Sequence, residues 1–386
     1  MTILIDIRPL MDKYYSGVSE YVFRLLQAIF AIDTQNKYIL FCNAAGDVES
    51  RLPKFDQANV TVVTRHIPNK IFNYAMLWPF NRPRFDKLVG EKVDIFFMPH
   101  LQFASVSAGV KSILAIHDIS FLVNPRFFSW RKNVWHWFVN ARRLARRFDR
   151  VVAVSESTKQ DLVRIAGVDE QRIRVIHSGI LPEFKPMDEA ATAEVRGRYG
   201  LAKPYIFFLA TIEPRKNIEG LCEAFSILKE DEKYSDLELV IAGGRGWKAG
   251  PIFKALKHSA HASDIRILDY VPSEDRPALY AAASVFAFPS FYEGFGFPPL
   301  EAMACGTPVV VAANSSLFEI VGTAGILVDP YEPAAIARGI DEIMSNPALA
   351  QELSEAGIRQ AAQFSWNNAA QAYIELFNEL NNNVSS

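Results

Sequence analysis

The chain has 386 residues, half of them hydrophobic, and a formal net charge of −2 at pH 7. This length accommodates two domains of ordinary size, and the balanced charge gives no signal for a nucleic-acid partner. The three cysteines, Cys42, Cys222 and Cys305, lack the spacing of a metal or redox site and indicate a reducing compartment.

The N-terminal segment, residues 1–8, contains an acid, Asp6, too early for a secretion signal, and its apolar residues predict a first strand. No uninterrupted apolar run approaches the ~20 residues that span a bilayer. The best candidate, 279–292, is interrupted by a proline and serines. We therefore expect a cytoplasmic protein, either soluble or peripheral at the inner face of the plasma membrane.

Short apolar runs alternate with helical patterns along the whole chain. In the first half, strands are predicted at 3–7, 38–42, 60–63, 95–98, 112–116, 151–154 and 173–176, and a helix at about 18–31. In the second half, strands are predicted at 205–210, 237–242, 265–268, 285–288, 309–311 and 326–328. Apolar strands separated by helices favour parallel sheets covered on both faces. We expect an α/β protein of two such units with a ligand cleft between them.

A domain boundary is predicted near residues 181–203, which three prolines bracket, with a polar helix at 188–199. A last helix is predicted from 364–366 to about 380. The final residues, 381–386, are expected to fray.

The segment 290–301 reads SFYEGFGFPPLE and has seven residues between Glu293 and Glu301. It joins a predicted strand to a predicted helix whose first turn contains Pro298 or Pro299, where no backbone N–H is needed. A glycine loop at a helix N-terminus lets backbone N–H groups and the helix dipole face an anion. One glutamate then lies in the loop and the other about two turns into the helix. This arrangement suits a nucleotide-sugar, whose phosphates lie between two hydroxyl-bearing rings.

This segment resembles the E-x7-E signature of the retaining glycosyltransferases of group 1 (GT4), which have the GT-B architecture. The stretches 116–118, 155–159, 175–179 and 209–217 are similar to other parts of that family, so the resemblance covers most of the chain. It is weakest between residues 47 and 94.

The resemblance implies two Rossmann-like domains whose parallel sheets face an interdomain cleft. The N-terminal domain, 1–184, would bind the acceptor, and the C-terminal domain, 185–365, would bind the nucleotide-sugar. A C-terminal helix, 366–386, would cross back to the first domain.

The same resemblance implies roles for the residues of the signature. Glu293 would contact hydroxyls of the donor sugar, and Glu301 would bind the nucleotide ribose. The backbone amides that would hold sugar and phosphate are those near Phe295, Gly296, Phe297 and Leu300. The alternative interpretation is an ordinary pair of exposed glutamates at a helix start.

Arg215 and Lys216 follow the predicted strand 205–210, where positive side chains would neutralise the charge that grows on a leaving diphosphate. Many family members place an arginine five positions before this lysine, but this chain has Thr211 there and an arginine immediately before the lysine instead. Lys216 is therefore the primary candidate, and Arg215 is its neighbour in the same role. Solvated surface charge is the alternative.

Three further candidates lie in the first half. His117 and Asp118 follow the predicted strand 112–116, where an imidazole would hydrogen-bond the transferred sugar or its phosphate; the alternative is a histidine that caps a loop. Gly17 opens the first helix, at a turn that approaches the donor phosphates in the family. Family members often have paired glycines there, and a simple turn glycine is the alternative.

Two loops of the second half complete the predicted donor site. The segment 243–246 reads GGRG and fails the dinucleotide pattern G-x-G-x-x-G. Gly244 is therefore assigned to a nucleotide-side loop, with a plain turn as the alternative. Val271 belongs to a segment similar to the one whose backbone meets the base in the family.

Residues 130–148 combine six Lys or Arg with several aromatic residues on one predicted helix. Basic and aromatic residues together suit an anionic membrane surface. The alternative is a normal amphipathic helix with its aromatic residues in the core.

The expected function is retaining transfer of a hexose from a nucleoside-diphosphate sugar, of the UDP-glucose or GDP-mannose type, to a hydroxyl of a glycan or lipid-linked acceptor. Bacterial surface polysaccharide synthesis is the expected setting, and retention is inherited from the family resemblance. The sequence has no Asp-x-Asp and no His/Cys cluster with metal-ligand spacing, so we expect no metal and no cofactor.

Three other functions remain open from the sequence. A sugar-nucleotide epimerase of the same architecture would use the donor without an acceptor. An NAD-dependent dehydrogenase is disfavoured because the first turn lacks three glycines. A sugar-nucleotide-binding protein without catalysis would bind a donor and release no nucleoside diphosphate.

Overall fold

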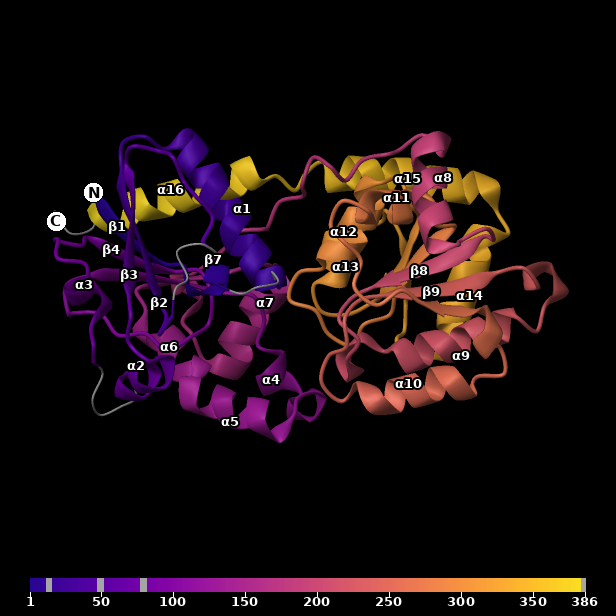
Figure 1. Cartoon of the computed structure of the whole chain (residues 1–386), viewed down its shortest axis with the longest axis horizontal. Helices are drawn as coiled ribbons and strands as arrows, with labels where there is room; N and C mark the ends of the chain where they lie inside the picture. The colour runs from indigo at the N-terminus through magenta and orange to yellow at the C-terminus, as the bar shows by residue number, and fades with distance from the viewer. Residues whose placement is uncertain (12–15, 47–51, 77–81, 383–386) are drawn as a thin grey trace. The chain divides into compact units, whose positions relative to one another are not determined.

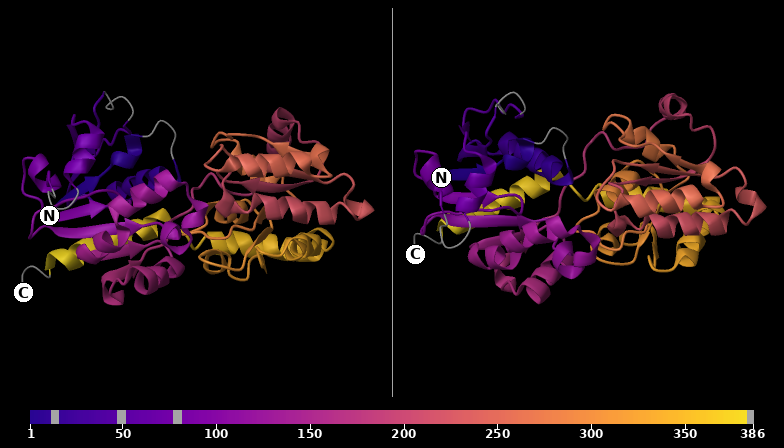
Figure 2. Two further views of the ribbon diagram at one scale, coloured as in Figure 1. Left: turned by 90° about the horizontal axis from the view of Figure 1, so that it is seen from below. Right: turned by 60° about the horizontal axis from the view of Figure 1, so that its bottom comes forward.

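The computed structural model describes residues 1–11, 16–46, 52–76 and 82–382. They form two compact units (Figure 1). The first unit contains the described residues of Met1–Ile119, Arg131–Gly179 and Ser365–Ser386, and the second contains Ser120–Trp130 and Ile180–Phe364. Each unit is a parallel sheet covered by helices on both faces (Figure 2).

The first sheet has seven parallel strands in the order β3-β2-β1-β4-β5-β6-β7. Their bounds are β1 (Thr2–Asp6), β2 (Lys37–Asn43), β3 (Val60–Arg65), β4 (Ile95–Met98), β5 (Lys111–Ile116), β6 (Arg150–Ala153) and β7 (Ile173–Val175). The central register pairs Leu4 with Ile39 on one side and with Phe96 on the other. All seven predicted strands are confirmed. Inner strands such as β4 are buried on both faces and read as continuous apolar runs, whereas the edge strand β3 is partly exposed.

Helix α1 (Gly17–Ile32) begins at the N-cap Ser16, whose side chain accepts a hydrogen bond from Ser19 N. Its buried face packs against α16 (Trp366–Asn382), which lies alongside it in Figure 1. The hydroxyls of Tyr21 and Tyr373 are 2.7 Å apart and join the two helices. The other helical segments of this unit are η1 (Arg8–Met11), α2 (Asn69–Ala75), α3 (Phe85–Leu88), α5 (Trp130–Val139, of which Trp130 belongs to the second unit), α6 (Ala141–Arg147), α7 (Glu156–Asp161), η3 (Leu162–Ala166) and η4 (Glu170–Arg172).

The single helix predicted over 130–148 is wrong, because the structure has two helices, α5 and α6. Asn140 separates them with a left-handed φ of 48°, a conformation that asparagine tolerates better than most residues. The Asn140 side chain accepts a hydrogen bond from Arg143 N and so caps α6. The alternative that placed the aromatic residues in the core is also wrong for three of them: Trp130 is 71% exposed, Trp137 73% and Phe138 46%.

The second sheet has six parallel strands in the order β10-β9-β8-β11-β12-β13. Their bounds are β8 (Tyr205–Leu209), β9 (Glu238–Ala242), β10 (Ile265–Ile267), β11 (Val285–Phe288), β12 (Val309–Ala312) and β13 (Ile326–Val328). All six predicted strands are confirmed.

The helices of the second unit lie on both faces of its sheet. Helices α9 (Ile218–Leu228) and α10 (Ala249–His258) pack together, as do α8 (Glu189–Tyr199) and α11 (Arg276–Ala281) on the other face (Figure 1). The remaining helical segments are α4 (Ser120–Val123), η2 (Pro125–Phe127), η5 (Pro214–Lys216), η6 (Glu232–Tyr234), η7 (Ala262–Asp264), α12 (Phe297–Ala304), α13 (Leu317–Val321), α14 (Pro333–Met344) and α15 (Pro347–Ala361).

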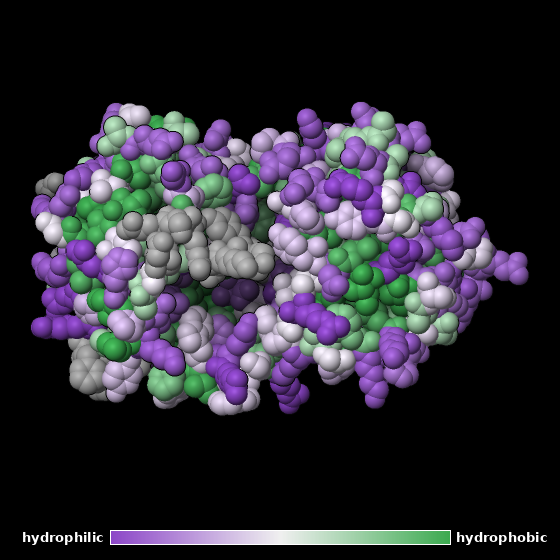
Figure 3. All heavy atoms as spheres, viewed as in Figure 1, coloured by the Kyte–Doolittle hydropathy of each residue, from purple (hydrophilic) through white to green (hydrophobic). Residues whose placement is uncertain are grey.

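The strand order reverses once in each sheet, between β1 and β4 in the first unit and between β8 and β11 in the second. Ligands of open parallel sheets bind at the carboxyl ends of the strands where this reversal occurs. On the face drawn in Figure 3, hydrophilic and apolar side chains are intermixed on both units. Within the described ranges, no helix combines the length and the apolar character that crossing a membrane requires.

Candidate active site

Two adjacent strands of the second sheet position the charged residues of the predicted donor site. Arg215 and Lys216 lie in the turn η5 just after β8, and Glu293 lies in the loop after β11. Strand β8 pairs with β11 at the point where the strand order reverses. The fold therefore brings Glu293 to Arg215 and Lys216, which precede it by 78 and 77 residues in the chain.

Glu293 is the centre of this arrangement. Its Oε1 accepts hydrogen bonds from Lys216 Nζ at 2.5 Å and from Ser290 Oγ at 2.6 Å. Its Oε2 accepts one from Arg215 Nη1 at 2.9 Å. The residue is only 7% exposed, so a buried carboxylate is stabilised by two cations and a hydroxyl.

A second acid, Glu213, completes the set, and we call Glu213, Arg215, Lys216, Ser290 and Glu293 the Glu293 cluster. Glu213 pairs with Arg215 at 3.0 Å and is 1% exposed. The two acids and two bases leave the cluster with no net charge when all four are ionised.

Burial and charge shift the pKa values of the cluster in different directions. Burial raises the pKa of Glu213. Burial acts in the same sense on Glu293, but Arg215 and Lys216 outweigh it and hold the pKa of Glu293 below its usual value. Burial and the nearby Arg215 lower the pKa of Lys216 although both acids oppose them.

Two serines after β12 hold the backbone of the Glu293 loop. Ser315 Oγ accepts a hydrogen bond from Glu293 N at 3.0 Å. Ser316 Oγ donates to the carbonyls of Glu293 and Phe295. Sequence reasoning missed both serines, because their role depends on β12 lying beside β11 rather than on any local pattern.

Helix α12 begins at Phe297, with Gly296 as its N-cap at a φ of 121°, a conformation that favours glycine. Pro298 and Pro299 have no N–H, so any backbone donor of the first turn comes from Gly296 or Phe297. Phe295 is buried and its ring contacts that of Phe297 at 5.0 Å. These residues lie where the signature predicts an anion-binding backbone.

Glu301 is the fifth residue of α12, a little more than one turn into the helix. The prediction of about two turns is wrong, because the helix begins at Phe297, only four residues before Glu301. Glu301 Oε2 accepts a hydrogen bond of 2.8 Å from the buried Tyr280 hydroxyl. Leu300, beside it, is fully buried in the core.

The loop after β9 packs against the segment that leads to the Glu293 cluster. Ile212 N donates to the Gly244 carbonyl at 2.9 Å, and Gly246 N donates to the Ile212 carbonyl at 3.0 Å. Val271 is buried in another loop, where its carbonyl accepts a hydrogen bond from Arg276. Gly244 and Val271 thus lie in loops after neighbouring strands β9 and β10.

His117 and Asp118 follow β5 in the first unit, as predicted. His117 Nε2 lies 2.9 Å from the Pro99 carbonyl, which only accepts, so Nε2 carries the proton and Nδ1 has the lone pair of the neutral ring. Burial lowers the pKa of His117, although the Pro99 carbonyl and Asp118 act in the opposite direction. The ring also meets Tyr21 edge-on at 4.4 Å. The neutral imidazole therefore offers a hydrogen-bond acceptor.

The family model described as "Glycosyl transferases group 1" matches residues 194–360, and "Glycosyltransferase Family 4" matches residues 15–184. The chain is 32% identical over 288 residues to the O-antigen chain mannosyltransferase B of Escherichia coli, covering 73% of this chain and 72% of that protein. The chain belongs to the group 1 glycosyltransferase family.

Other relatives agree with this assignment. The glycosyltransferase is 31% identical over 278 residues to the serotype-specific mannosyltransferase WbdA of Escherichia coli, covering 70% of this chain and 34% of WbdA. The chain thus spans about a third of that relative's length.

Solved structures show the fold of this glycosyltransferase to be GT-B. Sucrose-phosphate synthase of Thermosynechococcus elongatus superposes with a TM-score of 0.75 at 20% identity, covering 98% of each chain. HepE of Anabaena, in complex with UDP and glucose, gives a TM-score of 0.73 at 18% identity, covering 98% of this chain and all of that one.

Sequence reasoning missed a buried cluster in the first unit of the glycosyltransferase, at the strand reversal between β1 and β4. Asp6 ends β1 and binds the Arg8 guanidinium through hydrogen bonds of 2.6–3.0 Å. His100 follows β4, with Nε2 3.6 Å from Asp6 Oδ2. His100 Nδ1 is buried and has no hydrogen-bond partner within the described residues. The only signal in the sequence was the presence of charged residues directly after two apolar strands.

Gly17 is the first residue of α1, and a Cβ there would meet nothing within 4 Å. Neither close packing nor a left-handed backbone therefore requires a glycine at this position. Its predicted approach to donor phosphates stays a prediction. Among the described residues, no group of three or more His, Cys, Asp or Glu is placed to hold a metal ion.

His100 is expected to make this glycosyltransferase sensitive to acid. Burial lowers the pKa of His100 from 6.5 to about 4, with Asp6 opposing and Arg8 and His117 adding to the effect. Between pH 6.5 and about pH 4, His100 binds a proton in the unfolded chain but not in the folded chain. The free energy of unfolding therefore falls as the pH falls. From pH 6.5 to 5 this amounts to roughly 2 kcal/mol.

Urea unfolding of the wild type and the His100→Asn variant at pH 7 and pH 5 measures this effect. The variant is expected to lose less of its unfolding free energy between the two pH values, by roughly the same 2 kcal/mol. An equal loss in both proteins would show that His100 does not carry the acid sensitivity.

Proposed function

We propose that this glycosyltransferase moves a hexose from a nucleoside-diphosphate sugar to a hydroxyl of a glycan or lipid-linked acceptor, in the synthesis of a bacterial surface polysaccharide and with retention of anomeric configuration. The observation that carries the proposal is the Glu293 cluster at the strand reversal of the second sheet. Mannose from GDP-mannose is favoured over glucose from UDP-glucose, because the O-antigen and WbdA relatives are mannosyltransferases by name.

The cluster offers a mechanism for departure of the diphosphate. Lys216 and Arg215 neutralise Glu293 in the structure, and a bound diphosphate supplies competing negative charge to the same two cations. Glu293 is then released toward sugar hydroxyls while the cations stabilise the leaving group. The N–H groups of Gly296 and Phe297 and the dipole of α12 add to the positive field.

In this proposal no metal ion takes part, because Lys216 and Arg215 supply the charge that a cation would supply. His117 Nδ1 accepts a hydrogen bond from a sugar hydroxyl, with Asp118 beside it, and Gly17 opens the helix that faces the donor phosphates. Glu301 binds the ribose, and the loops of Gly244 and Val271 lie on the nucleotide side.

We also propose that the protein contacts the inner surface of the plasma membrane peripherally. The observation that supports this contact is the surface of α5 and α6, where exposed Trp137 and Phe138 adjoin several arginines.

The test is a donor screen with the purified chain. GDP and GDP-mannose are expected to raise the melting temperature more than UDP and UDP-glucose do, because a ligand that binds only the folded state stabilises it. GDP is expected to be released only when a mannan or lipid-linked glycan acceptor is present. This release is expected to persist in EDTA. Donor conversion without acceptor would indicate an epimerase, and binding without release would indicate a non-catalytic protein.

The contact of Tyr280 with Glu301 gives a separate prediction. Tyr280→Phe removes the hydroxyl that orients Glu301, so the KM for the donor is expected to rise about 3–10-fold while kcat stays within about twofold. The control is Tyr199→Phe, which removes a similar hydrogen bond of 2.7 Å to Asp275 in the same unit. An unchanged KM in Tyr280→Phe would argue against ribose binding by Glu301.

A further inference from the structure

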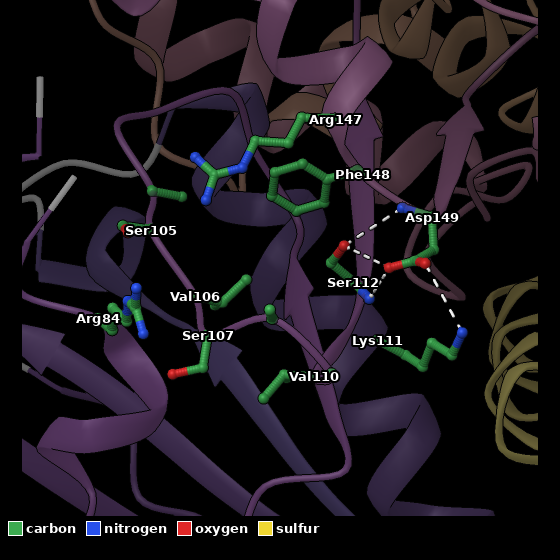
Figure 4. Close-up of a pocket in the computed structure, with 13 residues that line it drawn as sticks. Arg84, Ser105, Val106, Ser107, Val110, Lys111, Ser112, Arg147, Phe148 and Asp149 are labelled. Atoms are coloured by element: carbon green, nitrogen blue, oxygen red, sulfur yellow. Dashed lines mark hydrogen bonds and ion pairs between the residues drawn. The ribbon is translucent and has the colours of Figure 1, made fainter. Parts of the chain in front are cut away.

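The first unit contains a cavity of about 430 Å³ at the amino ends of β5 and β6. The loop 104–110 forms one wall, and Arg84, just before α3, and Arg147, at the end of α6, form others. Figure 4 shows both guanidinium groups pointing toward the same space, with the hydroxyl of Ser107 at its edge. We call this cavity the arginine pocket.

The charges of the arginine pocket are unbalanced. Within the described part of the chain, neither Arg84 nor Arg147 has an acidic partner. The nearby acids are already engaged, since Asp86 accepts a hydrogen bond from Ser107 N and Asp149 accepts two from Ser112. Burial and repulsion from Arg143 and Arg84 lower the pKa of Arg147, as expected for cations gathered without a counter-ion.

The pocket also contains an unused hydrogen-bonding group. Ser107 Oγ is buried and has no partner among the described residues. A buried hydroxyl without a partner costs free energy. An anion between the two guanidinium groups would remove both the charge imbalance and this cost.

The arginine pocket continues into a groove of about 320 Å³ through Ala104 and Arg147, which line both. The groove is mainly apolar and is lined by Phe103, Trp137, Phe138, Val139 and Leu144, with Arg143 at its side. A further hollow beside it is lined by Arg142, Arg143 and Arg146. We call the groove of about 320 Å³ the aromatic groove. Together with the arginine pocket it forms a combined site that has a charged end and an apolar end.

The arginine pocket is distinct from the predicted site at His117. It lies at Lys111, the first residue of β5, whereas His117 follows Ile116, the last. A strand rises about 3.3 Å per residue, so the two ends are roughly 17 Å apart. The pocket therefore lies at the opposite edge of the sheet from the carboxyl ends of the strands.

We propose that the arginine pocket binds the phosphate of a lipid headgroup while the aromatic groove receives the beginning of its hydrocarbon chain. Two guanidinium groups without acids match a phosphate, and exposed aromatic rings beside them match the interface of a bilayer. A free phosphate ion satisfies only the charged end. This inference rests on the proposed membrane contact and adds the residues and the headgroup chemistry that create it.

The test is flotation of the full chain with phosphatidylcholine vesicles that contain 0 or 30% phosphatidylglycerol. The wild type is expected to bind the anionic vesicles, and Arg84→Gln/Arg147→Gln is expected to bind them at least 10-fold more weakly. The charge-matched control is Arg338→Gln/Arg359→Gln, two exposed arginines of α14 and α15, with a change under twofold. Arg84→Lys/Arg147→Lys keeps the charge and is expected to recover part of the affinity.

Each other result overturns the inference in a recognisable way. Equal losses in the Arg84/Arg147 and control pairs would leave membrane contact as a general charge effect without a pocket. Absence of vesicle binding by the wild type would overturn both the pocket and the membrane contact. Stabilisation of the wild type by inorganic phosphate, lost in Arg84→Gln/Arg147→Gln, without vesicle binding would assign the pocket to a free anion instead. Transfer from GDP-mannose to a soluble acceptor is measured separately, so failure here is distinguishable from failure of the proposed reaction.

Discussion

Glu293→Gln is expected to lower kcat for sugar transfer by about 100–1000-fold, the range seen when one preorganised electrostatic group is removed from an active site. Glutamine keeps the size of the side chain but removes its charge. It also places an amide N–H₂ where Lys216, Arg215 and Ser290 now donate to a carboxylate. The sugar then loses its charged acceptor, and the cluster gains one positive charge.

The same substitution is expected to keep or strengthen binding of the nucleoside diphosphate, because a charged Glu293 no longer competes with the diphosphate for Lys216 and Arg215. Single-turnover transfer and calorimetric titration with GDP measure the two effects separately. The control is Glu352→Gln on the exposed surface of α15, which removes the same charge from the same unit. A kcat within threefold of the wild type, or loss of GDP binding together with activity, would contradict the assigned role.

The architecture could be predicted from sequence because its determinants are local. Most strands in the described part of the chain are short apolar runs, as parallel strands buried on both faces require. The Glu293 loop was also recognisable, since its glycines, prolines and glutamates occur in one segment. Arg215 and Lys216 were predictable as residues that follow an apolar strand.

The contacts that make these residues a site were not predictable in the same way. The bond of Tyr280 to Glu301 and the support of Glu293 by Ser315 depend on which strands and helices become neighbours. The pairing of Asp6 with Arg8 and His100 required the adjacency of β1 and β4. The break at Asn140 arises from one left-handed residue inside a segment whose composition is otherwise helical.

Gly243→Ala is expected to destabilise the second unit by about 3–5 kcal/mol, combining backbone strain with overpacking. Gly243 has a φ of 136°, which side-chain-bearing residues rarely adopt, and a Cβ there would lie 1.9 Å from the Ala210 carbonyl oxygen. No rotamer relieves this overlap because both groups belong to the backbone or are attached directly to it. One of the two strands that end there, β8 or β9, must therefore shift.

Urea unfolding measures this loss, with Gly250→Ala as the matched control. Gly250 lies in the first turn of α10, and a Cβ there would meet nothing within 4 Å. The control is expected to be neutral or to stabilise the protein by up to about 1 kcal/mol, because alanine favours a helix more than glycine does. A Gly243→Ala variant within 1 kcal/mol of the wild type would contradict the steric argument. The folded fraction of this variant should also transfer sugar more slowly, since Ala210 lies three residues before Glu213 and its displacement moves the Glu293 cluster.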